Sequence, residues 1–173
     1  QLMALRSTIG LLMLWPLLHV NGGLAAIRTQ RLREHTVRNT VHYGAQYAWF
    51  VALTMIPLAQ VVAIEFTMPI WIILLAAAFL GERITRWKVL AVALGLLGVG
   101  LVVRPDAAGL NPGQAVALAA AIGFAVSVTL TKRLTRTDGA LTIIFWMLLV
   151  QSILGALPAL AVISFLESSV FPI

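Results

Sequence analysis

The chain has 173 residues, of which 61% are apolar and only 10% are Asp, Glu, Lys or Arg. A soluble domain carries about 25% charged residues, so this composition excludes a water-soluble globule. The apolar content also excludes intrinsic disorder, and the absence of cysteine excludes a disulfide-stapled secreted fold. We therefore expect an all-α integral membrane protein with the lipid bilayer as its surroundings.

Long stretches without a charged residue divide the chain into segments that can cross a membrane. A helix needs about 20 mostly apolar residues to span a hydrocarbon core of about 30 Å. The pattern predicts six transmembrane helices, at about 3–21, 39–57, 60–80, 87–104, 113–131 and 140–163. Their continuous apolar character argues against a transmembrane barrel, whose strands alternate polar and apolar residues.

The basic residues are concentrated in three of the five connections between these helices. Ten of them lie there: Arg28, Arg31, Arg33, Arg38, Arg83, Arg86, Lys88, Lys132, Arg133 and Arg136. The positive-inside rule then places loops 22–38, 81–88 and 132–139 in the cytoplasm. We interpret the net charge of +6 as a topology signal and expect no nucleic-acid partner.

This orientation places the start of the chain on the outer side of the membrane. Residue 1 is Gln1 rather than Met, and the segment after it lacks the pattern of a signal peptide. We therefore expect at least one helix to precede this sequence in the full protein.

The second predicted helix carries a polar stripe. At 100° per residue, one arc of about 120° holds Asn39, His42, Tyr43, Gln46 and Thr54. Such a stripe must be covered by other helices or by water. Two interpretations fit, namely hydrogen bonds that hold helices together and the wall of a hydrated cavity. Because Tyr43 and Phe50 accompany the polar groups, we favour the cavity.

Glu65 is the one acidic residue deep in a predicted span. An ionised carboxylate there costs on the order of 3 kcal/mol or more, so it must be protonated, paired or exposed to water. Three interpretations stay open: a structural ion pair with Arg6, which lies at a similar depth; proton coupling or cation binding; and exposure to an outer vestibule. Pro69 removes a backbone hydrogen bond in the same helix and predicts a kink.

Other polar residues give weaker signals. Gln151 lies near mid-membrane in the sixth predicted helix, where it makes either an interhelical hydrogen bond or a solute contact. His19, His35 and His42 lack metal-ligand spacing, and no catalytic motif occurs. We therefore expect no enzyme activity, no cofactor and no metal site.

Two consecutive segments carry a family resemblance. The run PLAQVVAIEFTMPIWIILLAAAFLGERIT (57–85), followed by WKVLAVALGLLGVGLVVRP (87–105), resembles the end of an EamA-type repeat of the drug/metabolite transporter superfamily. The segment 113–134 resembles the opening helix of a second such repeat. The resemblance implies a ten-helix fold of two inverted five-helix repeats, of which this chain would supply helices two to seven. Residues 1–105 would be the first repeat without its first helix, and residues 106–173 the opening two helices of the second.

The resemblance also implies a function. A protein of this family would be a secondary transporter (permease) of small polar metabolites in the plasma (bacterial inner) membrane, working by alternating access. On the solute path we place Tyr43, Gln46, His42, Glu65 and Gln151, with the hypothesis that Glu65 senses protons or a cationic group. Glu82 would be structural, capping a helix or pairing with a loop arginine. The alternative is a multi-pass structural or assembly subunit that transports nothing.

Overall fold

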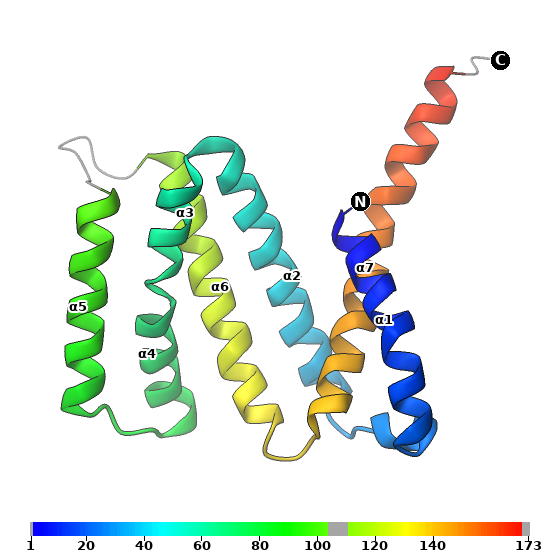
Figure 1. Cartoon of the computed structure of the whole chain (residues 1–173), viewed down its shortest axis with the longest axis horizontal. Helices are drawn as coiled ribbons and strands as arrows, with labels where there is room; N and C mark the ends of the chain where they lie inside the picture. The colour runs from blue at the N-terminus through cyan, green and yellow to red at the C-terminus, as the bar shows by residue number, and fades with distance from the viewer. Residues whose placement is uncertain (1, 104–110, 171–173) are drawn as a thin grey trace. The chain divides into compact units, whose positions relative to one another are not determined.

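The fold is helical throughout the part of the chain that the structure describes. A computed structural model describes residues 2–103 and 111–170, with the backbone alone for 2–4, 102–103 and 157–170. Within these ranges there is no strand (Figure 1). The helices are α1 (Leu2–Val20), a short 3-10 helix η1 (Gly23–Ile27), α2 (Leu32–Met55), α3 (Leu58–Glu65), α4 (Met68–Leu80), α5 (Arg86–Val103), α6 (Pro112–Leu134) and α7 (Ala140–Val170). The prediction of an all-α chain is confirmed.

The predicted helix at 60–80 is divided in two. Helix α3 ends at Glu65, and α4 begins at Met68 after a tight turn through Phe66 and Thr67. Pro69 lies in the first turn of α4, where a backbone N–H has no helical partner and proline is tolerated. The interruption therefore precedes the proline by two to three residues, where we had predicted a kink at Pro69 itself.

Two helix starts follow from local chemistry. Helix α2 begins at Leu32, seven residues before the predicted position, and Glu34 in its first turn suits the positive end of the helix dipole. Helix α6 begins with a capping box, in which Asn111 and Gln114 exchange hydrogen bonds of 2.9 and 3.1 Å between side chain and backbone N–H. Pro112 takes the first helical position between them.

The described residues form two compact units. The first unit comprises Gln1–Thr40 and Leu134–Ile173, and the second comprises Val41–Arg133. The chain passes from one unit to the other within α2 and again at the end of α6. The predicted boundary between repeats, at residues 105 and 106, lies outside the described residues, as does Arg104.

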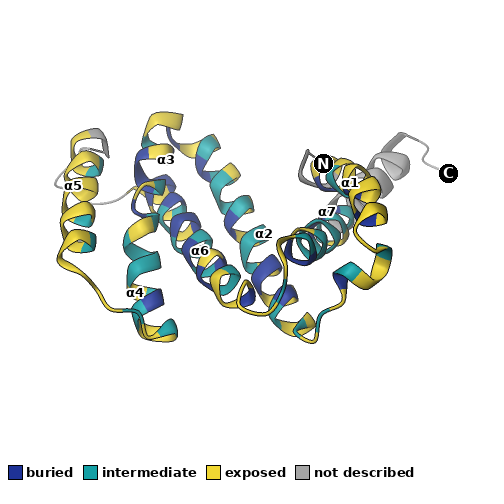
Figure 2. Ribbon diagram, turned by 60° about the horizontal axis from the view of Figure 1, so that its bottom comes forward, coloured by how far each residue is buried: buried dark blue, intermediate teal, exposed yellow. Residues whose placement is uncertain are grey.

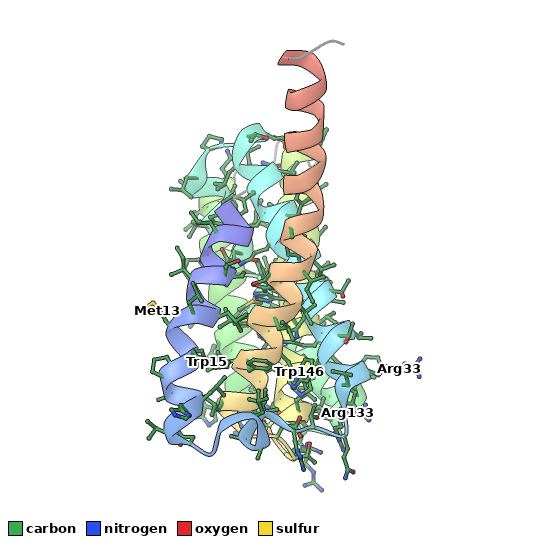
Figure 3. All side chains as sticks on the ribbon, turned by 90° about the vertical axis from the view of Figure 1, so that its right-hand side faces the viewer. Met13, Trp15, Arg33, Arg133 and Trp146 are labelled. Carbon is green, nitrogen blue, oxygen red and sulfur yellow. The ribbon has the colours of Figure 1, made fainter. Side chains whose placement is uncertain are left out.

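In the first unit, α1 and α7 pack side by side in opposite directions. Ser7 contacts Gln151, and Gly10 lies against Leu148. Further along, a small core joins both helices to η1 and consists of Leu14, Leu18, Ile27, Leu141, Phe145 and Leu148. Met13, on the exposed side of α1, points away from α7 (Figure 3).

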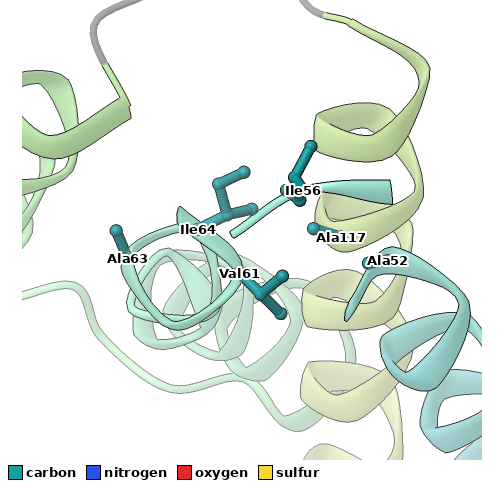
Figure 4. Close-up of a cluster of buried hydrophobic side chains, with 6 residues drawn as sticks. All are labelled: Ala52, Ile56, Val61, Ala63, Ile64 and Ala117. Carbon is teal, nitrogen blue, oxygen red and sulfur yellow. The ribbon is translucent and has the colours of Figure 1, made fainter. Parts of the chain in front are cut away.

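In the second unit, α2 and α6 pack in opposite directions along their length. Ala45 lies against Gly123 near the middle, and Ile56 lies against Gly113 at the far end. Helix α3 folds back onto this pair, and its apolar side closes a core made by Ala52, Ile56, Val61, Ala63, Ile64 and Ala117 (Figure 4). Helix α5 packs mainly against α3.

Apolar side chains also cover the outside of several helices. Two helical segments of the described residues, Leu58–Leu80 taken across the break and Pro112–Leu134, are long and apolar enough to cross a membrane. Helix α5 is exposed along most of its length (Figure 2), although its exposed residues include Val89, Leu90, Leu94, Leu97 and Leu101. Water would be a poor solvent for such a surface, whereas hydrocarbon suits it.

Candidate functional site

The candidate site is a polar row on α2 within the second unit. His42, Gln46 and Trp49 follow one another at spacings of four and three residues, so they lie on one side of the helix. Nδ1 of His42 lies 3.2 Å from Oγ of Ser127 on α6. The His42 ring also meets the edge of Phe124, with ring centroids 5.3 Å apart. The N-terminal member of the row is thus joined to α6.

Gln46 differs from its neighbours in the row. Its Oε1 atom is buried, and within the part of the chain that the structure describes it accepts no hydrogen bond. A buried amide oxygen without a donor costs about 1–3 kcal/mol. The stability of α2 does not explain why the Gln46 amide oxygen is buried without a donor. A binding site, in which a ligand supplies the hydrogen-bond donor, does explain it.

Glu65 lies at the last residue of α3 and reaches the same row. Nε1 of Trp49 donates a hydrogen bond of 2.9 Å to Oε2 of Glu65. The side chain is half-buried, and none of the ion pairs among the described residues includes it. Because an indole is neutral, it orients the carboxylate without cancelling its charge. Among the described residues, the hydrogen-bond partner of the Glu65 carboxylate is thus a neutral donor.

The other predicted site residues lie in different surroundings. Tyr43 is half-buried on α2, next in sequence to His42. Gln151 is 1% exposed in the first unit, where its Oε1 atom accepts hydrogen bonds from Arg6 at 3.2 Å and Ser7 at 3.3 Å. Gln151 thus joins α7 to α1, and its buried Nε2 has no partner among the described residues. Arg6 and Glu65 belong to different units, so their pairing stays a prediction.

Two partners in this site were not predicted from the sequence. Trp49 lies outside the arc of polar residues. It was not predicted as a site residue, because a tryptophan in a span is usually a packing residue or an interfacial anchor. Ser127 lies on a face of α6 otherwise made of Ala119, Ala120 and Gly123, which indicates close packing alone. Asn39, by contrast, was assigned to the polar stripe, but it is buried in the first unit and donates to the Trp146 carbonyl at 2.9 Å.

A second polar cluster lies in the first unit, where η1, α2 and α7 meet. The fully buried His35 places Nε2 2.6 Å from Oδ2 of Asp138, and the Thr29 hydroxyl donates to the same oxygen at 2.6 Å. Nearby, Trp146 on α7 donates to the Ile27 carbonyl at 3.1 Å (Figure 3). Burial alone would raise the pKa of Asp138, but hydrogen bonds from His35, Thr29 and Thr137 outweigh it and hold the pKa below its usual value.

Glu82 forms a third cluster, in the second unit. It follows Gly81, whose φ of 69° ends α4 in the left-handed conformation that glycine adopts easily. Its carboxylate pairs with Lys132 at the end of α6 and with Lys88 at 3.4 Å. Hydrogen bonding from Lys132, more than from Lys88, lowers the pKa of Glu82. Glu82 was predicted to cap a helix or to pair with a loop arginine; its carboxylate pairs instead with two lysines.

Comparison with known proteins identifies the family. The model of the EamA-like transporter family matches residues 1–104, which is more than half of the chain. The chain belongs to this family. EamA transporters are integral membrane proteins of the bacterial inner membrane, which accounts for the exposed apolar helices, and the relatives named below are bacterial.

Several curated EamA relatives are similar over most of the chain. A riboflavin transporter of Brucella anthropi is 31% identical over 86% of this chain and 52% of its own length. A pseudopaline exporter of Pseudomonas aeruginosa is 30% identical over 90% of this chain and 54% of its own length. An S-adenosylmethionine uptake transporter of Rickettsia bellii is 24% identical over 80% of this chain and 47% of its own length. The chain thus spans about half the length of the relatives it matches, and no solved structure matches it.

Proposed function

We propose that the full-length protein is a secondary transporter that carries a small polar solute across the membrane by alternating access. The observation that carries this proposal is the environment of Glu65. Its carboxylate lies at an interruption between two helices, inside an apolar segment, and its hydrogen-bond partner is neutral. Interrupted helices near the middle of the membrane are where secondary transporters hold their solutes and coupling ions.

The polar row on α2 forms the rest of the proposed path in the second unit. Gln46 offers a buried amide oxygen that lacks a donor, while His42 and Tyr43 add a ring nitrogen and a hydroxyl. Glu65 is proposed as the ionisable element that binds a proton or a cationic group. Gln151, in the other unit, remains a proposed solute contact through its unpartnered Nε2 atom.

Contacts inside each unit support the proposed orientation in the membrane. Asp138, in the connection before α7, contacts Thr29 in the connection before α2. Lys132, in the last turn of α6, pairs with Glu82 in the connection before α5. Loops 22–38, 81–88 and 132–139 are therefore proposed to share one side, which the excess of arginine and lysine makes cytoplasmic.

We also propose the fold of two inverted repeats for the full-length protein. Residues 1–105 belong to the first repeat, residues 106–173 open the second, and the chain supplies helices two to seven of ten. In support, the chain spans between 45% and 54% of the length of its relatives.

Accessibility of Gln46 separates a transporter from a subunit that only holds an assembly together. We expect Gln46→Cys in the full-length protein to react with a membrane-impermeant thiol reagent, because a solute path contains water. Ala52→Cys on the same helix is the matched control, since Ala52 is fully buried in the core and stays protected. Equal protection at both positions would contradict the path.

Riboflavin and S-adenosylmethionine, after which two relatives are named, are the first solutes to assay in proteoliposomes.

A further inference from the structure

An apolar groove of about 620 Å³ runs between α5 and the pair α3–α4 in the second unit. We call it the α5 groove. Its walls include Val62, Phe66 and Pro69 on one side and Ala91, Gly95 and Gly98 on the other. The first wall flanks the interruption between α3 and α4. The second wall repeats small residues at spacings of four and three, so it is one side of α5.

The groove is open space rather than a packed seam. A Cβ atom added to Gly95 or Gly98 would have no other heavy atom within 4 Å. The lining of α5 runs from Ala91 to Val99, which is about 12 Å along the helix axis at 1.5 Å per residue. One leaflet of a bilayer is about 15 Å thick in its hydrocarbon part, which is half of the whole core. The groove therefore suits one acyl chain in length and in polarity.

Basic residues cluster where α5 begins, at one end of the groove. Arg83, Arg86 and Lys88 lie within six residues of one another, and Lys132 joins them through Glu82. The cluster thus holds four cations, of which Lys88 and Lys132 pair with Glu82. Lys88 lies one turn before Ala91 on the groove side of α5, where an exposed Trp87 also suits the membrane interface.

Within the described ranges, the two arginines of this cluster have no partner to neutralise them. Arg83 and Arg86 are exposed, and among the described residues neither makes an ion pair or a side-chain hydrogen bond. Arg86 begins α5 about 7.5 Å before Ala91 along the axis. This offset corresponds to the step from a lipid phosphate to the start of its acyl chain.

We propose that the α5 groove and the basic start of α5 form a binding site for an anionic phospholipid. One acyl chain occupies the groove, and Arg83 and Arg86 bind the phosphate and its negative head group. Basic pockets between transmembrane helices on the cytoplasmic side bind anionic head groups in this way. A neighbouring helix is the other candidate occupant, but a helix would leave the two arginines without an anion. The proposal is independent of the solute and of transport.

The direct test compares two lipids that differ only in the head group. Purified full-length protein in detergent is titrated with phosphatidylglycerol or phosphatidylcholine of identical acyl chains, and native mass spectrometry counts the bound lipids. We expect the protein to bind a phosphatidylglycerol molecule that phosphatidylcholine does not replace. The thermal midpoint of the protein should also be higher with phosphatidylglycerol than with phosphatidylcholine. Equal binding of the two lipids would overturn the proposal.

Two pairs of variants locate the site. Gly95→Leu fills the groove, whereas Gly100→Leu adds the same side chain on α5 outside its lining, where there is also open space. Only Gly95→Leu should lose the bound lipid. The double variant Arg83→Gln, Arg86→Gln should weaken the binding of phosphatidylglycerol on the order of tenfold or more. Each basic residue near the surface contributes about a fivefold change in affinity for an anionic lipid. Arg33→Gln with Arg136→Gln removes the same charge elsewhere and should have little effect.

The same variants also test whether a helix, rather than a lipid, occupies the α5 groove. If another helix of the full-length protein fills the groove, Gly95→Leu lowers the thermal midpoint in lipid-free detergent and leaves lipid binding unchanged. That outcome, or equal lipid loss in both glycine variants, would overturn the proposal.

Discussion

Three acidic side chains of the described residues have hydrogen-bond partners of three different kinds. Glu82 pairs with two lysines, Asp138 accepts from an imidazole and hydroxyls, and Glu65 accepts from an indole. The first two arrangements favour the ionised carboxylate and lie in connections between helices, as expected of structural contacts. Only Glu65 lies within an apolar segment beside a neutral donor. This contrast, rather than its position alone, is the reason that we propose Glu65 as the functional carboxylate.

The Asp138 cluster gives a pH-dependent prediction. Its pKa in the folded protein lies below the ordinary value of about 4, so the stabilisation is complete above pH 4 and is lost as the pH falls through the lower, folded-state pKa. We expect Asp138→Asn to destabilise the folded protein by about 1–3 kcal/mol at pH 7, the range for hydrogen bonds to a charged group. The difference from wild type should shrink below pH 4.

Thermal midpoints measured between pH 3 and pH 8 check this prediction. Glu34→Gln is a control, because Glu34 pairs with Arg31 at 3.5 Å on a partly exposed helix face, where such pairs contribute about 0–1 kcal/mol. A midpoint for Asp138→Asn that equals that of the wild type at pH 7 would show that the cluster is not a stabilising one.

At the scale of elements, small residues set how closely the helices approach. A Cβ atom on Gly123 would lie 2.8 Å from Cβ of Ala45, well inside van der Waals contact. Both atoms are close to rigid backbone, so α2 and α6 have to move apart to admit it. Gly10 is different, because its neighbour is the flexible end of Leu148.

We therefore expect Gly123→Ala to destabilise the second unit by about 1–3 kcal/mol, the usual cost of overpacking. Gly44→Ala on α2 is the matched control, since a Cβ atom there meets no other heavy atom within 4 Å. It should be neutral or slightly stabilising, because alanine favours a helix more than glycine does. The thermal midpoints of the two variants in one detergent decide the matter, and equal values would contradict close packing at Gly123.

Helix positions were largely predictable from the sequence, but two boundaries were not. Charge-free length locates the membrane-crossing part of a helix, whereas α2 extends beyond it through Leu32–Arg38, a stretch that carries charged side chains. The break at Phe66 and Thr67 carries no glycine, and Pro69 indicates a disturbance without giving its position. Tertiary packing of α3 on α2 and α6 determines that position, and no local pattern records it.

The candidate site was predictable only in part. Helical periodicity places His42, Tyr43 and Gln46 on one side of α2, because the spacing is a property of the helix itself. The partners Trp49 for Glu65 and Ser127 for His42 depend on which helices pack together. The cluster of His35 with Asp138 joins residues 103 positions apart, a separation that periodicity cannot address.

At the scale of the whole molecule, the family of the chain supports the proposed mechanism of transport. The chain belongs to the EamA-like transporter family by its match over residues 1–104. One relative is named for uptake and another for export. For this protein, we propose that Glu65 and the polar row on α2 line the solute path.

The most direct test of the central claim is Glu65→Gln in the full-length protein. The variant keeps the hydrogen bond from Trp49 but removes the titratable charge. Proteoliposomes with an imposed pH gradient are loaded with whichever of riboflavin or S-adenosylmethionine the wild type carries, and flux is measured at several pH values. We predict that Glu65→Gln is expressed and folded, with pH-dependent transport reduced by at least tenfold. Unchanged pH-dependent transport together with a lower thermal midpoint would contradict the account and show that Glu65 serves the structure alone.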